Sequence, residues 1–201
     1  MTRADLSTDE AARPPVPRFF WERFSALRTP EGADLAALRR GIGREAGTVP
    51  EMWRFYTYLN ASGSLTKELR AEHLALTLFA IHQQSKTDLM HHRETGLGTA
   101  LLALKRSGRF SEDALDRRFA AAATATSLTE IAVHLRGLVN QLRLISQPLD
   151  YTKLVNDLTY WQSSNGSDIV RRRWGGQYFA SGAPQQQSDR STNATRSSSS
   201  Q

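Results

Sequence analysis

The helical periodicity of apolar residues between Leu97 and Trp161 limits the possible folds of this chain more than any other feature. The clearest example spans residues 127–147, where apolar side chains recur every three or four positions. They are Ile131, Leu135, Leu138, Leu142 and Ile145. At about 100° per residue these side chains form one narrow stripe along a helix. The segment is therefore predicted to be an amphipathic helix whose apolar stripe faces a core.

The opposite face of this predicted helix carries positive charge. Arg136 and Arg143 both point away from the apolar stripe, and no acidic residue occurs in residues 131–149. Because the two arginines are seven positions apart, they are separated by about 10 Å along the axis, enough to contact different phosphates of one strand. We therefore expect this face to bind a polyanion.

Most of the remaining chain has the same helical character, and no segment alternates polar and apolar residues as a strand does. Helices are predicted at 19–27, 34–41, from 48, at 66–84, 97–106, from 111, and at 127–147, 150–161 and 168–179. The segment 66–84 is apolar around most of its girth, which predicts a central helix. The sequence therefore predicts an all-α fold of about eight or nine helices.

Local signals support several of the predicted helix starts. Thr48 with Glu51, and Ser127 with Glu130, have the spacing of a capping box, in which the two side chains bind each other's backbone amides. Ser111 is a further predicted N-cap, because acidic residues follow it in the first turn, where the helix dipole favours them.

Changes in composition along the chain divide it into four parts. Residues 1–17 are proline-rich and are predicted to form a flexible arm. Residues 18–110 and 111–180 are predicted to form two small helical bundles that pack together. Residues 181–201 are rich in Ser, Gln, Asn and Thr and nearly free of large apolar side chains, so this tail is predicted to be disordered.

The overall composition excludes several classes of function. The chain has no cysteine, which excludes a disulfide framework, a cysteine zinc site and a cysteine nucleophile. No signal peptide and no apolar run of roughly 18 residues is recognisable, so we expect a cytoplasmic protein with no membrane partner. A net charge of +6 and a pI near 10.0 favour an anionic partner, because they raise the local potential.

The sequence contains no recognisable catalytic motif. The Gly41-Ile-Gly43 segment lacks the later glycine and lysine of a phosphate-binding loop and follows no predicted strand. His73 and His82 are nine residues apart on one predicted helix, so they lie on opposite faces and cannot share a metal within that helix. We therefore expect no enzymatic activity, metal, cofactor or small-molecule substrate.

Each basic residue also has a purely structural explanation. Lys105 and Arg106 are predicted at a helix C-terminus, where cations are favoured by the dipole alone. Arg117 can pair with Asp113 at the i,i+4 spacing. The three arginines at 171–173 fan around a helix and cannot all face one ligand. Charge alone therefore leaves the binding surface undefined.

A set of short motifs resembles the CasB family, the small subunit of the type I-E CRISPR Cascade complex. The resemblance covers about residues 19–179 and depends on the order and spacing of the motifs rather than on any single one. They are Leu38-Arg-Arg-Gly41, Thr48-Val-Pro-Glu-Met-Trp-Arg-Phe55, Leu97-Gly-Thr-Ala-Leu101, Ser107-Gly-Arg109, Arg117-Arg118, Leu135-Arg136 and Leu158-Thr-Tyr-Trp161.

The resemblance implies a wholly helical, non-enzymatic subunit. Members of the family sit as a pair of copies beside the backbone subunits and the large subunit. Their basic surface stabilises the R-loop, in which the target DNA strand pairs with guide RNA and the other strand is displaced. The implied contact residues are Arg39, Arg40, Arg54, Lys105, Arg106, Arg109, Arg117, Arg118, Arg136 and Arg143. Lys86, at a predicted helix end, is added to this set.

Two other functions remain open at this level. One is a stand-alone regulator that reads duplex DNA with a helix–turn–helix, which requires side chains that discriminate between bases. The other is a metal-dependent nuclease, which requires carboxylates that converge on Mg²⁺. Base preference and DNA cleavage, respectively, would distinguish them from the leading hypothesis.

Overall fold

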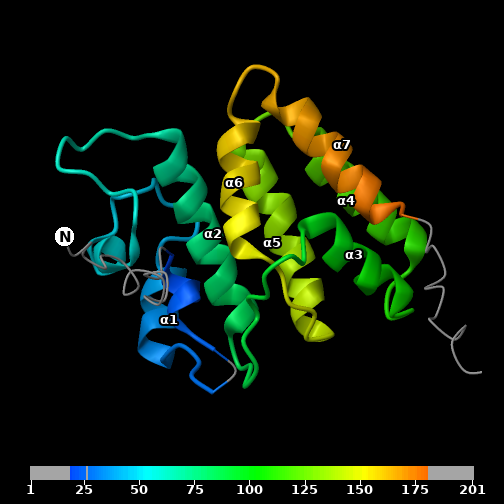
Figure 1. Ribbon diagram of the computed structural model, residues 1–201, viewed down its shortest axis with the longest axis horizontal. Helices are drawn as coiled ribbons and strands as arrows, with labels where there is room; N and C mark the ends of the chain where they lie inside the picture. Colours follow the sequence, from blue (N-terminus) through cyan, green and yellow to red (C-terminus); the bar gives the residue numbers. More distant parts are fainter. Residues whose placement is uncertain (1–18, 26, 181–201) are drawn as a thin grey trace, which may run out of the picture.

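The structure is a computed structural model that describes residues 19–25 and 27–180. In chain order its helices are η1 (Phe20–Arg23), α1 (Gly32–Arg39), η2 (Pro50–Phe55), α2 (Lys67–Gln83), α3 (Leu97–Arg106), α4 (Glu112–Thr124), α5 (Leu128–Leu144), α6 (Tyr151–Trp161) and α7 (Gly166–Tyr178), with η for 3₁₀-helices. The described residues contain no strand, only two isolated β-bridges. The predicted all-α fold is confirmed (Figure 1). The predicted arm (1–17) and tail (181–201) lie outside the described residues.

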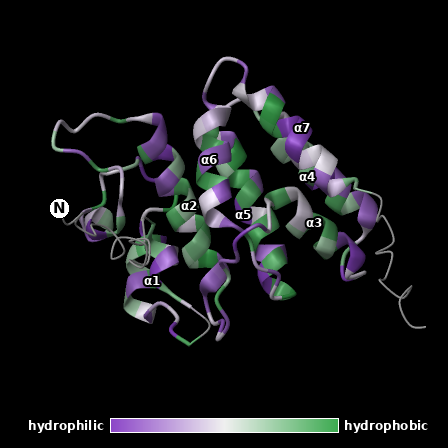
Figure 2. Cartoon of the chain, viewed as in Figure 1, coloured by the Kyte–Doolittle hydropathy of each residue, from purple (hydrophilic) through white to green (hydrophobic). Residues whose placement is uncertain are grey.

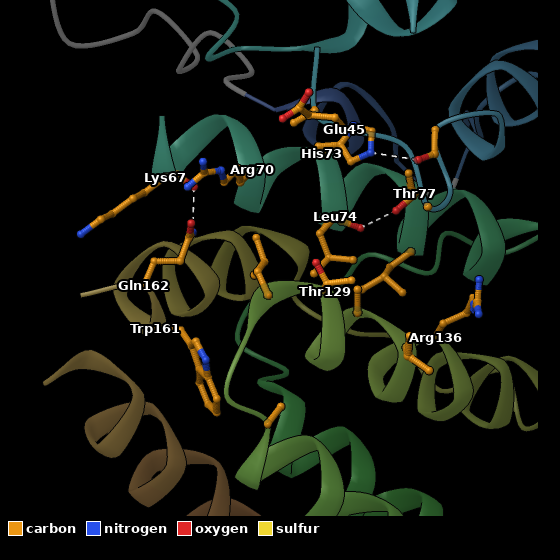
Figure 3. Close-up of a pocket in the computed structure, with 18 of the residues that line it drawn as sticks. Glu45, Lys67, Arg70, His73, Leu74, Thr77, Thr129, Arg136, Trp161 and Gln162 are labelled. Atoms are coloured by element: carbon orange, nitrogen blue, oxygen red, sulfur yellow. Dashed lines mark hydrogen bonds between the residues drawn. The ribbon is translucent and has the colours of Figure 1, made fainter. Parts of the chain in front are cut away.

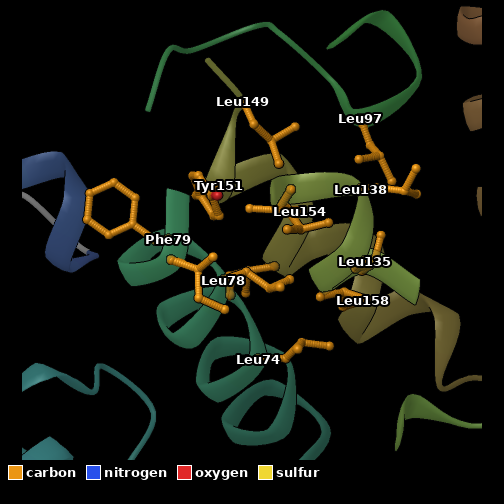
Figure 4. Packing of buried hydrophobic residues seen from close by; sticks show 14 of the residues in the cluster. Leu74, Leu78, Phe79, Leu97, Leu135, Leu138, Leu149, Tyr151, Leu154 and Leu158 are labelled. Carbon is orange, nitrogen blue, oxygen red and sulfur yellow. The ribbon is translucent and has the colours of Figure 1, made fainter. Parts of the chain in front are cut away.

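Helix α2 lies at the centre of the fold, as its apolar sequence predicts. Every residue from Ala71 to Gln83 is buried. It packs against α1 on one side and against α5 and α6 on the other. Leu74 and Leu78 of α2 meet leucines from α5 and α6 in the core (Figure 4). Because apolar burial is the main stabilising term in folding, this helix organises the arrangement of the others.

Helices α3, α4 and α7 extend the core away from α1. The principal contact of α3 is with α7, and α4 packs on α5. Gly98 allows this close approach, because a Cβ at that position would collide with the carbonyl oxygen of Trp174. One cluster of buried apolar side chains runs through both predicted bundles. Helix α3 precedes residue 110 but packs on helices that follow it, so the division at that point stays a prediction.

Four helices begin with a side-chain cap. The acceptors are Thr66 for Leu69 N (3.1 Å), Ser111 for Ala114 N (3.5 Å), Ser127 for Glu130 N (3.1 Å) and Asp150 for Lys153 N (2.9 Å). The caps predicted at Ser111 and Ser127 are confirmed. Each satisfies an amide that has no partner within its helix.

Two predicted helices are wrong. The segment 19–27 contains only the short η1, and Phe24 is extended so that its ring packs 5.0 Å from that of Phe20. The helix predicted from Thr48 is the 3₁₀-helix η2, which has Val49 at its N-cap. The Thr48 hydroxyl instead donates to the Glu45 carbonyl (2.8 Å). In both places packing with distant residues overrides the local signal.

Candidate nucleic-acid interface

Two of the predicted contact residues join α1 to η2. Arg40 pairs with Glu51, and Arg54 pairs with Asp34 at 2.6 Å. In the first pair the arginine is at the end of α1 and the carboxylate is on η2, and in the second pair the arrangement is reversed. The Arg54 guanidinium also lies 4.7 Å from the centre of the Phe55 ring. These cations have carboxylate partners within the chain, so their charge is already partly neutralised.

Lys105 is held in the same way at the end of α3. Its ammonium lies 3.0 Å from Asp116 and 3.4 Å from Glu112, both on α4. It also lies 5.5 Å from the centre of the Tyr178 ring. The hydrogen bond to Asp116 raises the pKa of Lys105. Lys105 thus connects α3 with α4 and α7.

Four arginines near this connection are exposed: Arg106, Arg109, Arg117 and Arg118. We call them the α3–α4 arginine group. Arg106 ends α3, Arg109 lies in the short connection, and the other two lie on α4. Within the part of the chain that the structure describes, none of them forms an ion pair. Their charges are therefore available to an outside anion.

The two arginines of α5 differ in their surroundings. Arg136 is exposed, whereas Arg143 is half-buried and its Nε atom is enclosed with no hydrogen-bond partner among the described residues. Lys86 lies nearby and donates to Ser146 Oγ at 2.8 Å. Burial is the largest cause that lowers the pKa of His82 to about 3, and the charges of Lys86 and Arg143 contribute to the same shift. Lys86 and Arg143 thus both lie near His82, whereas Arg136 lines a groove that neither of them lines.

The predicted basic residues therefore fall into separate groups. Arg39 is half-buried at the end of α1, the helix that Arg40 and Arg54 join to η2. Helix α1 lies at one end of the molecule, whereas α3 and α4, which carry most of the α3–α4 arginine group, lie at the other (Figure 1). Apolar residues occur along α2, α3 and α5, whereas many residues of α7 are polar (Figure 2). The structure does not bring all eleven predicted residues together.

A groove that the sequence analysis missed lies between α2 and α5. Its volume is about 950 Å³, and the 41–46 loop and the α6–α7 connection complete its walls (Figure 3). The lining contains five cationic side chains and one carboxylate, Glu45. The cations are Arg44, Lys67, Arg70, Arg136 and Arg171. Of these, only Arg136 belongs to the predicted contact residues.

Among the groove cations, only Arg171 donates side-chain hydrogen bonds to other described residues. It donates to the carbonyl oxygens of Ala123 (2.6 Å) and Ala125 (3.1 Å) at the C-terminal end of α4 and pairs with Asp168 (3.0 Å). It also lies 5.0 Å from the centre of the Trp161 ring. Cations are favoured at helix C-termini. Arg171 is therefore explained as a cap for α4.

The buried histidines take part in hydrogen bonds that support the fold. His73 bonds to the Tyr56 hydroxyl (2.6 Å) through one ring nitrogen and to the Gly41 carbonyl (2.9 Å) through the other. Burial lowers the pKa of His73. Among the described residues, no three His, Cys, Asp or Glu side chains are placed to hold a metal ion. None of the described helices is long and apolar enough to cross a membrane.

The model of the CRISPR-associated protein Cse2 family matches residues 34–179 of this chain. The chain belongs to the Cse2 family. This confirms the resemblance to the CasB family, and it supports a role as a small structural subunit of the CRISPR Cascade complex.

Two solved structures are similar to this Cse2-family chain. CasB from Thermobifida fusca is 35% identical, with a TM-score of 0.60 over 73% of this chain and 83% of that one. A Cse2-family CRISPR-associated protein from Thermus thermophilus is 25% identical, with a TM-score of 0.58 over 74% and 86%. Among curated proteins, none was found to match the chain.

Proposed function

We propose that this Cse2-family chain is the non-catalytic small subunit of a type I-E CRISPR surveillance complex in the cytoplasm. It binds nucleic-acid backbone without reading sequence and stabilises the R-loop. Its partners are the backbone subunits, the large subunit, a second copy of itself, guide RNA and target DNA. The observation that supports this role best is the α3–α4 arginine group, four exposed cations without carboxylate partners beside an ion pair that fixes their connection.

The physical chemistry of an R-loop suits such a surface. Pairing between guide and target reads the sequence, so the protein needs only contacts to sugar and phosphate. R-loop formation exchanges one duplex for another of similar stability, so a few phosphate contacts can shift the balance. Each neutralised phosphate steepens the log–log salt dependence by about 0.7 for single strands and about 0.9 for duplex.

We rank the predicted contact residues by their exposure and by their existing ion pairs. The α3–α4 arginine group comes first, because its four members are exposed and unpaired within the described part of the chain. Arg136 is also exposed and unpaired there, but it lines the groove between α2 and α5 and is not part of that group. Arg39, Lys86 and Arg143 come second, because they are half-buried. Arg40, Arg54 and Lys105 come last, because carboxylates already bind them. An R-loop contact at the last three would have to compete with an existing ion pair.

Two matched double variants test this proposal in the reconstituted complex. Arg117→Ala with Arg118→Ala removes two unpaired cations, and Arg40→Ala with Arg54→Ala removes two paired ones. We expect the first to shorten the lifetime of the R-loop on every target sequence and the second to have much less effect. Equal lifetimes for the first variant and the wild type would refute the assignment. An effect on only one target would favour base reading.

A nuclease assay distinguishes the remaining alternative. The purified chain is incubated with labelled single- and double-stranded DNA and RNA in the presence of Mg²⁺ or Mn²⁺. We expect every substrate to stay intact, because the proposed role needs only backbone contacts. Metal-dependent cleavage that co-purifies with the chain would overturn the non-catalytic assignment.

A further inference from the structure

The groove between α2 and α5 has an aliphatic floor. The side chains that form it are Leu74, Leu78 and Ile81 of α2 and Leu128, Ala132 and Val133 of α5. Leu74 and Ile81 retain 8% exposure each, and Val133 is 56% exposed. Val133 is the most exposed of these six side chains, so the groove leaves apolar surface open on the α5 side.

The shape of this floor suits a helix. On α2, Leu74, Leu78 and Ile81 recur at i, i+4 and i+7, so they form a stripe along the helix. On α5, Leu128 and Ala132 are four residues apart and face the same way. From Lys67 to Ile81 the wall formed by α2 extends for about 21 Å, at 1.5 Å per residue. An incoming helix of about four turns can cover that length with its apolar face in the groove, a common mode of recognition.

The rim of the groove is positively charged. Arg44, Lys67, Arg70 and Arg136 have no ion-pair partner among the described residues, and Glu45 is the one carboxylate in the lining. Lys67 and Arg70 lie at one end of the groove and Arg136 at the other (Figure 3). Such a rim is complementary to a ligand with carboxylates at both ends and an apolar middle.

The floor favours a protein helix over a nucleic acid. A nucleic acid held by its backbone alone needs cations but no apolar floor, and one whose bases enter a groove stacks them on aromatic rings. Trp161 is only 6% exposed and has the Arg171 guanidinium over its ring, while both ring nitrogens of His73 are engaged. The floor therefore offers bases no aromatic platform, whereas its leucine, isoleucine and valine side chains suit aliphatic partners.

We propose that the groove docks an amphipathic helix of another protein subunit of the complex. Aliphatic side chains of that helix meet the floor, and its Asp or Glu side chains meet Arg44, Lys67, Arg70 and Arg136. The groove gives the Cse2-family chain a protein-docking site separate from the α3–α4 arginine group. This inference goes beyond the proposed function, because it does not need any contact with nucleic acid.

Two substitutions on α5 test the docking site. Val133→Asp places a carboxylate in the groove, whereas Leu144→Asp places one on the same helix outside the lining, at a side chain of similar exposure (56% and 50%). The dissociation constant is measured for incorporation of each labelled full-length chain into the complex, and circular dichroism checks folding. We expect Val133→Asp to weaken incorporation about tenfold or more, the effect of losing a central interface contact, and Leu144→Asp to have little effect. Equal effects of the two changes would overturn the proposal.

Photo-crosslinking in the assembled complex identifies the occupant directly and does not depend on the aspartate variants. A photoreactive apolar side chain replaces Val133, and another replaces Leu144 as the control. We expect position 133 to crosslink to one protein subunit, within a peptide that carries Asp or Glu at helical spacing. A crosslink to nucleic acid alone, or no crosslink above that at position 144, would refute a protein helix. Failure here would leave the R-loop lifetimes of the α4 arginine variants unaffected, so the two proposals fail separately.

Discussion

Lys105 Nζ lies 3.0 Å from Asp116 Oδ1, and this ion pair joins the end of α3 to α4. The Tyr178 hydroxyl donates to the same carboxylate oxygen at 2.6 Å, so the end of α7 is also attached. The four unpaired arginines of the proposed R-loop surface lie at the end of α3, in the connection and on α4. Asp116 therefore positions charges that it does not itself neutralise.

Replacing Asp116 by asparagine tests this attachment through its pH dependence. The Tyr178 hydroxyl and the Lys105 ammonium hold the pKa of Asp116 below its ordinary value. A lowered carboxyl pKa stabilises the fold above the ordinary Asp pKa of about 3.9, and the contribution is lost as the pH falls through the folded-state pKa. At pH 7 we expect Asp116→Asn to lower the unfolding free energy by less than about 1 kcal/mol, because the pair is partly exposed. Urea titrations should show the difference shrinking in acid, and a difference that persists there would contradict this account.

His82 predicts a second loss of stability in acid. Its cause differs from that at Asp116, because burial disfavours the charged form of His82 whereas hydrogen bonds favour the charged form of Asp116. Burial lowers the pKa of its imidazole to about 3. The unfolded chain binds a proton at about pH 6.5, so stability falls as the pH drops from that value towards the folded-state pKa. Between these two pKa values, the loss of unfolding free energy due to His82 approaches about 1.4 kcal/mol per pH unit.

The variant His82→Leu should therefore lose stability less steeply between pH 6.5 and pH 4.5 than the wild type. It should be less stable at pH 7, because the Tyr151 hydroxyl, 2.9 Å from His82 Nδ1, loses its partner. Chemical denaturation at several pH values measures both effects. Parallel pH profiles for variant and wild type would show that His82 is protonated in the folded chain.

Asp157 gives a prediction about a buried hydrogen bond. Its carboxylate accepts from Trp174 Nε1 at 2.7 Å and pairs with Arg173. Asp157→Ala leaves the buried indole N–H unpaired, which should cost about 1–3 kcal/mol. Burial raises the pKa of Asp157, so charge on this group is disfavoured, and Asp157→Asn should cost less because the amide oxygen still accepts. Equal losses for the two variants in urea titrations would contradict the hydrogen-bond explanation.

Two glycines on neighbouring helices provide a matched test of packing. Gly98→Ala brings a methyl group against the backbone of Trp174 on α7 and should destabilise the fold by about 1–3 kcal/mol. Gly137 lies inside α5, and a Cβ added there would meet no atom within 4 Å, so Gly137→Ala should stabilise the chain by up to about 1 kcal/mol. Thermal melting measures both. A neutral Gly98→Ala would show that α3 and α7 can separate without cost.

Local sequence signals predicted the elements whose boundaries depend on local chemistry. Helix α3 spans Leu97–Arg106 as predicted, and Ser111 and Ser127 cap the helices that follow them. The helices predicted at 19–27 and from Thr48 were wrong. The short 3₁₀-helices found there depend on aromatic packing and on the Arg40–Glu51 ion pair. No periodic pattern in the sequence indicates that the residues in these contacts lie close together.

The candidate site was less predictable than the fold. Whether Lys105 is free depends on Asp116 of another helix, and Arg143 is half-buried although the helical periodicity of its segment placed it opposite the apolar stripe. The groove combines Lys67 and Arg70 of α2 with Arg44 from a loop. The sequence did contain a signal for Lys67 and Arg70, because they are three residues apart in α2 and continue the line of its apolar residues with two cations. No sequence pattern places Arg44 beside them.

The salt dependence of R-loop binding tests the central claim most directly. Arg106, Arg109, Arg117 and Arg118 are all replaced by glutamine in the reconstituted complex, and the binding constant is measured over a range of salt concentrations. For contacts to single strands, we expect the log–log slope of the variant complex to be shallower than that of the wild type by about 2.8, because four phosphate contacts of about 0.7 each are lost. A slope equal to that of the wild-type complex would contradict this central claim.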